Sequence, residues 1–411
     1  MEKKYERGGK KMKIALVGAF DRYNYGDILM PIIMHNQIMT NLNLKNIDFS
    51  YYGLFKSDMS ECKGYSTDAL SELKNKEVDV IIFVGGEVLT SRFTGMYLNT
   101  LSNKIKIFYY KSMRRLFNSF TENICRKKTN LDYLKPWIPN KNNFKTNKLI
   151  YNTVGGDLFF GTNKDNITSV IVNINSFDYV SIRESQTYNS VKSIRKDVFM
   201  FPDSVIAISK YISEKEIEKN ISKAKKEFID GLGSYFVLQV NKIIGLKNIE
   251  TLTDEILKIE GKNDTKCILL PIGYAQGHED TVPLSMINNK INNEKTIYFD
   301  YNNIYETLYI LSHATLYIGT SLHGAITAIS YGIPHFALTN KIKKLDDFLE
   351  TWDTTDIIYS DIDKLSENYE KVSQNYNKFK KKVELQKEKM IKLVDENFQN
   401  INKIILEGKN E

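Results

Sequence analysis

Cysteine and histidine are scarce in this 411-residue sequence. The three cysteines, Cys62, Cys125 and Cys267, lie far apart and include no CxxC pair, so they predict neither a disulfide framework nor a zinc site. The five histidines include no HExxH pair, and we therefore expect no metal ion. Such cysteine usage is typical of a reducing compartment, so we expect a cytoplasmic protein.

Long hydrophobic runs are absent as well. No segment reaches the roughly 18 apolar residues that a membrane-spanning helix requires. Residues 1–11 are charged and lack the apolar centre of a secretory signal peptide, which argues against export. Within them, Arg7-Gly8-Gly9 can be encoded by a purine-rich ribosome-binding sequence, so Met12 is a second candidate for the start of translation.

Short apolar runs alternate with helix-like segments along the chain. The runs at 13–18 and 78–84, and those at 235–240 and 316–318, are each followed by turn residues, as in buried parallel strands. Alternating strands and helices predict βαβ units, and the length favours two domains. We expect an α/β protein with two Rossmann-like domains facing a cleft. The expected parts are an N-terminal domain over 12–212, a linker helix over 213–233, a C-terminal domain over 234–361 and a charged C-terminal helix over 362–411.

Positive charge is concentrated in the segment 101–145. Eleven Lys and Arg residues stand there against Glu122 and Asp132, a balance of +9, whereas the whole chain is +7, which leaves −2 elsewhere. Aromatic residues accompany the charge, a combination that suits an anionic membrane surface or a phosphate-bearing lipid carrier. The alternative is a solvated insertion that covers its own small apolar cluster. No nucleic-acid-binding module accompanies the segment, so we expect no nucleic-acid partner.

The most informative motif follows an apolar run in the second half. A strand should end at Gly319 and a helix begin near Leu322, with Thr320 or Ser321 as its cap. The free amides and the dipole of such a helix predict an anion site. His323 in the first turn could donate a proton or bind an anion. The alternative is a buried histidine bonded to a backbone group.

Polar residues also follow strands of the first half. Arg183 could clamp a carboxylate or phosphate, or pair with Glu184. Gly26 permits close approach of the backbone, and the neighbouring Asp27 could cap a helix or hold a hydroxyl. Asp203 could be a helix cap and nothing more. The dinucleotide fingerprint GxGxxG and the Walker phosphate loop are absent, so an NAD site is not expected.

One loop of the second half, at 273–280, is polar and contains glycine. It follows an apolar run and so belongs at the ligand-binding edge of a sheet. His278, Glu279 or Asp280 could hold sugar hydroxyls there, and simple solvation of the loop is the alternative.

In their order and spacing, these motifs resemble the polysaccharide pyruvyl transferase family. The resemblance spans about residues 12–338. It rests on Asn24-Tyr25-Gly26-Asp27, Gly85-Gly86, Ser181-Ile182-Arg183-Glu184, Pro202-Asp203, His278-Glu279-Asp280 and Gly319-Thr320-Ser321-Leu322-His323-Gly324.

The resemblance implies a fold similar to GT-B glycosyltransferases and transfer of pyruvate from phosphoenolpyruvate to two hydroxyls of a sugar, as a cyclic ketal. It implies no cofactor besides this donor substrate, and an oligosaccharide or lipid-linked acceptor from surface-polysaccharide synthesis. His323 would be the acid or the phosphate contact, and Arg183 would hold one anionic group of the donor. The implied substrate-binding residues are Asn24, Gly26, Asp27, Gly85, Gly86, Asp203, His278, Asp280, Thr320, Ser321, Leu322 and Gly324.

Two positions depart from the family pattern. Ser321 stands where well-studied members have an arginine, which removes a charge-assisted hydrogen bond worth about 1.5–3 kcal/mol. Another cation, such as Arg22 or Lys341, would have to substitute, or the affinity for the donor would be weak. Glu87 replaces a third glycine after Gly86. Two alternative functions therefore stay open: a GT-B-type glycosyltransferase that uses a nucleotide sugar, and a non-catalytic protein that binds a carbohydrate or its carrier.

Overall fold

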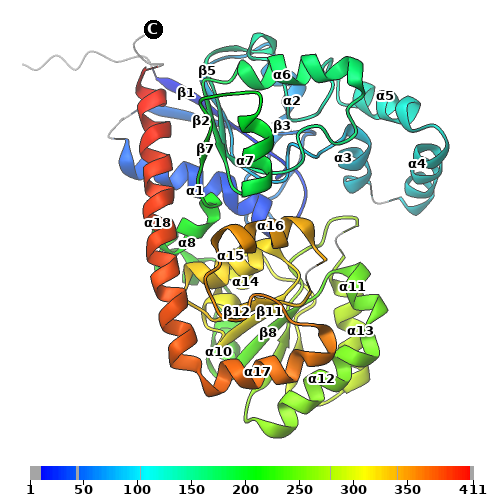
Figure 1. Ribbon diagram of the computed structural model, residues 1–411, viewed down its shortest axis with the longest axis vertical. Helices are drawn as coiled ribbons and strands as arrows, with labels where there is room; N and C mark the ends of the chain where they lie inside the picture. Colours follow the sequence, from blue (N-terminus) through cyan, green and yellow to red (C-terminus); the bar gives the residue numbers. More distant parts are fainter. Residues whose placement is uncertain (1–10, 43–45, 102, 278, 340, 408–411) are drawn as a thin grey trace, which may run out of the picture.

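The computed structural model describes residues 11–42, 46–101, 103–277, 279–339 and 341–407 (Figure 1). The strands of the first half are β1 (Met12–Val17), β2 (Ile47–Gly53), β3 (Asp68–Ala69), β4 (Glu77–Phe83), β5 (Lys145–Val154), β6 (Tyr179–Ile182) and β7 (Phe199–Met200). Its helices are α1 (Tyr25–Asn41), α2 (Leu70–Leu73), α3 (Phe93–Asn99), α4 (Lys104–Leu116), α5 (Asn118–Lys128), α6 (Ile167–Asn175), α7 (Ser185–Lys192) and α8 (Ile208–Tyr211), with 3-10 turns η1 (Lys141–Asn143), η2 (Lys164–Asn166) and η3 (Ser204–Ala207).

The second half repeats the alternation of strands and helices. Its strands are β8 (Tyr235–Gln239), β9 (Lys266–Leu269), β10 (Thr296–Tyr298), β11 (Leu316–Gly319) and β12 (His335–Ala337). The helices are α9 (Glu214–Lys219), α10 (Lys223–Asp230), α11 (Lys242–Lys247), α12 (Ile249–Lys262), α13 (Thr281–Ile291), α14 (Ile304–Ser312), α15 (Leu322–Ser330), α16 (Lys343–Trp352), α17 (Leu365–Gln374) and α18 (Tyr376–Glu407), with the 3-10 turn η4 (Ile362–Lys364).

Each half contains one parallel sheet. The first has the order β3-β2-β1-β4-β5-β6-β7 and the second β10-β9-β8-β11-β12. Neighbouring strands of both sheets pair in parallel. Both orders extend outward from the first strand and then reverse, as in dinucleotide-binding folds. The prediction of two Rossmann-like domains is confirmed.

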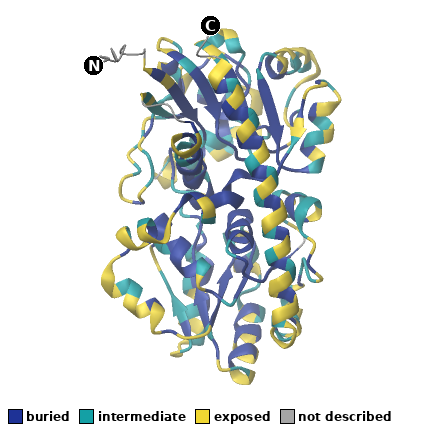
Figure 2. Ribbon diagram, turned by 90° about the vertical axis from the view of Figure 1, so that its left-hand side faces the viewer, coloured by how far each residue is buried: buried dark blue, intermediate teal, exposed yellow. Residues whose placement is uncertain are grey.

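The strands form because their side chains are buried on both faces. In β6 and β8 every residue is buried, which is typical of a parallel sheet covered by helices on each side. Figure 2 shows the same distribution, with buried strands inside and exposed residues on the outer faces of the helices. The continuous apolar runs of the sequence predict these strands for this reason.

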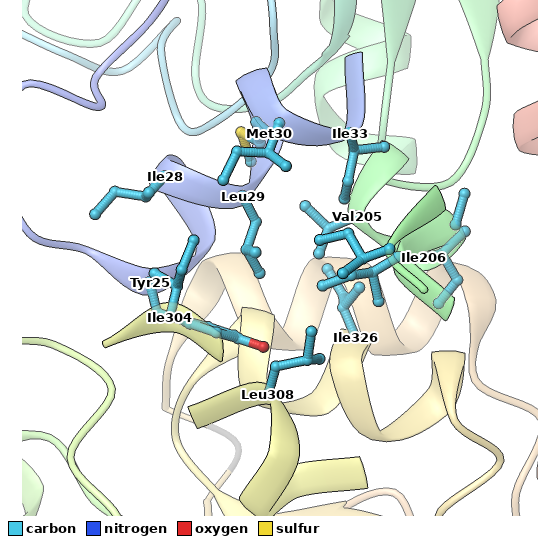
Figure 3. Close-up of a cluster of buried hydrophobic side chains, with 14 of the residues drawn as sticks. Tyr25, Ile28, Leu29, Met30, Ile33, Val205, Ile206, Ile304, Leu308 and Ile326 are labelled. Atoms are coloured by element: carbon cyan, nitrogen blue, oxygen red, sulfur yellow. The ribbon is translucent and has the colours of Figure 1, made fainter. Parts of the chain in front are cut away.

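A hydrophobic joint connects the two domains. One buried cluster joins side chains of α1, η3, α14 and α15, among them Leu29, Ile206 and Ile326 (Figure 3). Tyr25 of α1 adds a 3.1 Å hydrogen bond between its hydroxyl and Oγ1 of Thr327 in α15. Since α1 belongs to the first domain and α14 and α15 to the second, this cluster fixes the two domains against each other.

The C-terminal segment packs back across the first domain. Asn397 of α18 accepts a 2.9 Å hydrogen bond from the Tyr179 hydroxyl and donates one of 2.8 Å to Oδ1 of Asn152. Asn402 of α18 donates to Oε1 of Gln37 in α1 at 3.2 Å. These buried bonds fasten α18 to the first domain, and the helix runs along both domains on the left of Figure 1.

Two segments expected to be single helices are divided. The linker at 213–233 forms α9 and α10, because Ser213 caps the first and Ser222 caps a new helix. The segment 362–411 begins with η4 and α17, and α18 starts after a break at Asn375. Within the described ranges, no helix combines the length and the apolar character that crossing a membrane requires.

The basic segment at 101–145 has two parts with different environments. Its first part forms α4 and α5, which project from the first domain at the right of Figure 1. Its second part joins the core, where Trp137 is fully buried. Lys135 is also buried and donates to the carbonyls of Leu89 and Leu158 at 2.8 and 2.7 Å. Burial lowers the pKa of Lys135 to about 8.

Candidate active site

A cavity of about 770 Å³ opens between the domains, at the carboxyl ends of strands from both sheets. Ala19 and Arg22 follow β1, Glu87 follows β4, and His323 follows β11. These strands flank the points where each strand order reverses, between β1 and β4 and between β8 and β11. Open α/β sheets bind ligands at such switch points. The location makes this cavity the candidate active site.

His323 lies on the cavity wall in the first turn of α15 and contacts α1. A Cβ atom added at Gly26 would lie 1.9 Å from both Cγ and Nδ1 of His323, so the imidazole packs directly on the backbone of α1. The amino ends of α1 and α15 therefore meet at the cavity. First-turn amides and the positive ends of two helix dipoles favour an anion at this position.

Asp203 connects His323 to Arg183. Its Oδ2 lies 3.7 Å from Nε2 of His323 and accepts a 3.0 Å hydrogen bond from Nη1 of Arg183. Its Oδ1 accepts from the amide of Val205 at 3.0 Å and so caps η3. Burial would raise the pKa of Asp203, but His323 and Arg183 lower it to about 2. The carboxylate is therefore charged near neutral pH and can pair with a protonated His323.

The Nε2 atom of His323 lies on the side of the ring toward Asp203. It is buried, and among the described residues it has no hydrogen-bond partner. The sequence also allows a histidine bonded to a backbone group. Among the described residues, Nε2 forms no such bond. A buried nitrogen on a cavity wall, next to a charged carboxylate, is suited to proton transfer.

Arg183 is occupied by carboxylates. Its Nε donates to Glu184 at 3.0 Å, Nη1 to Asp203 at 3.0 Å and Nη2 to Glu87 at 2.8 Å. Burial alone would lower the pKa of Arg183, but these three carboxylates raise it above its ordinary value. The pairing with Glu184, left open by the sequence, is present. Arg183 is thus the centre of a buried ion-pair network beside the cavity.

Glu87 stands where the family pattern has a third glycine. Its carboxylate is the third one that pairs with Arg183. The preceding Gly85 and Gly86 have φ values of 129° and 93°, which favour glycine. They turn the chain after β4 and bring Glu87 to the cavity wall. These two glycines do not line the cavity themselves and shape the loop that does.

The network also requires Gly155, which no motif of the sequence singles out. A Cβ atom there would lie 2.5 Å from Oε1 of Glu184 and 2.7 Å from Nε of Arg183. The second domain reaches the same network, because Nε1 of Trp352 donates to the Arg183 carbonyl at 2.6 Å. The ion pairs therefore depend on close packing from both domains.

Asn24 and Asp27 line the cavity from the start of α1. Nδ2 of Asn24 donates to Oδ2 of Asp27 at 2.9 Å. Asn24 is the N-cap residue, but its side chain does not cap the helix. The carboxylate of Asp27 thus faces the cavity and can accept a hydrogen bond from a hydroxyl group.

Cationic side chains form much of the remaining wall: Arg22, Arg92, Arg114, Arg115 and Lys344. Arg22 pairs with Asp21, and Arg92 lies 3.6 Å from Glu122. Within the described ranges, no carboxylate lies within 4.0 Å of the charged groups of Arg114, Arg115 or Lys344. These three cations are therefore available to pair with an anionic ligand.

These cations are candidates to replace the arginine that the family pattern has at the position of Ser321. Of the two expected substitutes, Arg22 lines the cavity and Lys341 does not. Lys344, one turn further along the chain, does line it. Arg114 and Arg115 belong to the basic segment that the sequence singles out, but nothing in the sequence places them at this cavity.

The other polar residues of the motif at the start of α15 form hydrogen bonds within the protein. Ser321 caps α15 by accepting a 3.3 Å hydrogen bond from the amide of Gly324. Thr320 donates from its amide to Oε1 of Gln239 at 2.9 Å, and its hydroxyl accepts from the amide of Asn241 at 2.9 Å. Leu322 lines the cavity beside His323, whereas Thr320, Ser321 and Gly324 do not.

The loop at 273–280 is only partly at the cavity. Ala275 lines it, but Asp280 is buried and accepts from the amides of Ile272 and Gly273 and from Nε2 of Gln239. Burial raises the pKa of Asp280 to about 6. Asp280 thus holds the loop in shape instead of facing a sugar. The expected role of His278 falls outside the described residues.

The two sheets and the cavity between them define a two-domain α/β protein with GT-B-like architecture. Among solved structures, UDP-GlcNAc 2-epimerase from Methanocaldococcus jannaschii is similar in fold, with a TM-score of 0.51 and 14% identity, covering 87% of this chain and 92% of that one. UDP-GlcNAc 2-epimerase from Neisseria meningitidis bound to UDP-GlcNAc gives a TM-score of 0.51 and 12% identity, covering 97% and 99%.

The chain belongs to the polysaccharide pyruvyl transferase family, whose model matches residues 24–342. The family indicates a transferase that acts in polysaccharide modification. Among curated proteins, Endonuclease Bax1 of Sulfurisphaera tokodaii is 26% identical over 191 residues, which are 45% of this chain. The chain spans only 31% of the length of that relative.

Proposed function

We propose that this protein transfers pyruvate from phosphoenolpyruvate to two hydroxyls of a sugar in a surface-polysaccharide precursor, forming a cyclic ketal. The observation that carries the proposal is a cationic cavity in which His323 stands at the meeting point of two helix amino ends. The donor has a phosphate and a carboxylate, and both groups suit such a cavity. Family membership supports the same reaction class.

The reaction redistributes the protons of two sugar hydroxyls. One sugar hydroxyl attacks C2 of the donor while C3 accepts a proton and becomes a methyl group. The C2–O bond to phosphate then breaks, and the second hydroxyl closes the ketal at C2. Of the two hydroxyl protons, one replaces the proton delivered to C3 and the other leaves with the phosphate, so that the products are the ketal and inorganic phosphate.

His323 is suited to deliver the proton to C3. Its Nε2 is unpartnered among the described residues, and Asp203 stands 3.7 Å away as a counter-ion for the protonated ring. Once it has delivered that proton, the same nitrogen can recover one from a sugar hydroxyl. Asp27 at the cavity wall is placed to hold such a hydroxyl.

The unpaired cations would bind the anionic groups of the donor. Arg114, Arg115 and Lys344 are not neutralised by a described carboxylate, whereas Arg183 is paired three times. We therefore assign donor binding to these cations together with the first-turn amides of α15, and a positioning role to Arg183. Positive charge aimed at the departing phosphate also stabilises the transition state.

A nucleotide sugar is the alternative donor. The fold similarity extends over nearly the whole length of an epimerase solved with UDP-GlcNAc, and a cavity of about 770 Å³ is large enough for such a ligand. At 12% identity this similarity concerns the fold, so the family match favours phosphoenolpyruvate.

Calorimetric titration with phosphoenolpyruvate tests the proposal. We expect saturable binding to the wild type, weaker binding to His323→Ala and no heat from UDP-GlcNAc. Wild-type protein that binds UDP-GlcNAc and not phosphoenolpyruvate would contradict the proposal and favour a glycosyltransferase. Circular dichroism of the variant controls for loss of fold.

A further inference from the structure

The helices α4 and α5 expose large apolar side chains that no described part of the chain covers. The two helices pack against each other as a hairpin, and we name its exposed apolar residues the hairpin patch. Their exposed fractions are 80% for Ile105, 74% for Phe108, 56% for Tyr109, 72% for Leu116, 61% for Phe117 and 60% for Phe120. Exposed apolar residues gathered in this way mark an interaction surface, whereas single ones are ordinary.

The patch follows the periodicity of a helix. Ile105, Phe108, Tyr109 and Leu116 recur at the spacing of one helical face, and Ile107 on the opposite face is buried against the protein. The hairpin thus has one apolar face toward its own domain and another toward the outside. Phe117, which lies between the two helices, and Phe120 of α5 extend the exposed apolar residues beyond α4.

Positive charge surrounds this patch. Residues 103–128 contain eight Lys and Arg residues and one carboxylate, that of Glu122. Glu122 points inward, where it accepts hydrogen bonds from the amides of Phe93 and Thr94 at 2.7 and 3.1 Å and so fastens α5 to the start of α3. Among the described residues, none of the eight cations forms an ion pair within 4.0 Å.

We propose that the hairpin patch docks on a bilayer containing anionic phospholipid. Apolar side chains that enter the headgroup boundary, with Lys and Arg beside them, are the features of a helix that lies in a membrane interface. Charge complementarity selects an anionic surface, since the patch has basic neighbours and no outward carboxylate. In Figure 1, α18 lies on the opposite side of the molecule from α4 and α5.

The docking would bring the cavity to the membrane. Arg114 and Arg115, which belong to the same hairpin, line the cavity, as does Asn118. An acceptor sugar carried by a lipid would then enter from the bilayer; this consequence depends on the proposed function. The docking itself does not, because it requires neither donor nor turnover.

Sedimentation with vesicles tests the docking in the absence of phosphoenolpyruvate. We expect wild-type protein to sediment with phosphatidylcholine vesicles that contain phosphatidylglycerol, and much less with phosphatidylcholine alone. The charge variant Lys104→Gln/Lys106→Gln/Lys111→Gln should weaken binding at least about tenfold. These lysines do not line the cavity.

A matched variant controls for total charge. Lys381→Gln/Lys389→Gln/Lys392→Gln removes three exposed lysines from α18, and it should bind vesicles as the wild type does. Equal loss in both triple variants would show that net charge alone acts and would overturn the proposal.

An apolar variant tests the patch itself. Phe108→Ser/Phe117→Ser should lower vesicle binding at least about fivefold, because the side chains no longer enter the interface. Both residues are exposed, so the fold should persist, as circular dichroism would verify. Unchanged vesicle binding, or a dimer that this variant converts to a monomer, would overturn membrane docking.

Discussion

Replacing Gly26 by alanine tests the contact on which the site geometry depends. The added Cβ atom would lie 1.9 Å from Cγ and Nδ1 of His323. Ordinary carbon contacts are about 3.5–4.0 Å, so the imidazole would have to retreat by roughly 1.5 Å or more. The ring is buried where α15 meets α1, which leaves it little freedom to move.

Two opposing effects set the change in unfolding free energy that Gly26→Ala causes. Overpacking of this kind typically costs about 1–3 kcal/mol of unfolding free energy. Alanine is also a better helix former than glycine by up to about 1 kcal/mol. We therefore expect Gly26→Ala to destabilise the wild type, and to be neutral or stabilising once His323→Ala has removed the ring. The coupling between the two substitutions should be about 2–3 kcal/mol.

Urea unfolding of the wild type, both single variants and the double variant measures this coupling without any substrate. Gly261→Ala in α12 is a matched control, since its added Cβ would have no atom within 4 Å. It should leave stability unchanged or slightly raised. The same cost of Gly26→Ala with and without the His323 ring would refute the packing described for the site.

Three further predictions concern charge. Arg114→Gln/Arg115→Gln should weaken phosphoenolpyruvate binding about tenfold or more while leaving the melting temperature within a few degrees, and unchanged affinity by calorimetry would contradict the assignment of these cations. Glu87→Gln should keep the fold and alter donor affinity, because one nitrogen of Arg183 loses its carboxylate; identical titrations of variant and wild type would count against that network. Asp280 has a pKa raised by burial to about 6, so its protonated form is favoured in the folded state and stability falls as pH rises from about 4 to 6. Urea unfolding should show this loss, about 3 kcal/mol, in the wild type and not in Asp280→Asn, whereas parallel pH profiles would contradict it.

The fold could be predicted because its signal is local. Apolar runs and the turn residues after them mark strands that are buried on both faces, and the alternation with helices gives parallel sheets. No pattern predicts β3, because it has only two residues, Asp68 and Ala69. The breaks before α10 and α18 escape prediction because charged helical periodicity continues across them.

The site could be predicted only in part. His323 and Asp27 are visible in the sequence because each follows a strand within a short motif, and both line the cavity. The pairing of Arg183 with Glu87 joins residues 96 positions apart, which no local pattern reports. Lys344 reaches the cavity through the packing of α16, so its position depends on the tertiary structure alone.

The most direct test of the proposed reaction follows the carbon that becomes the ketal centre. Phosphoenolpyruvate labelled with carbon-13 at C2 would be incubated with the protein and a membrane fraction containing polysaccharide precursors, and the products analysed by nuclear magnetic resonance. We predict a labelled ketal carbon in the glycan and one phosphate released per ketal, with neither formed by His323→Ala. Label that stays in phosphoenolpyruvate, while a nucleotide sugar is consumed by the same protein, would contradict pyruvyl transfer.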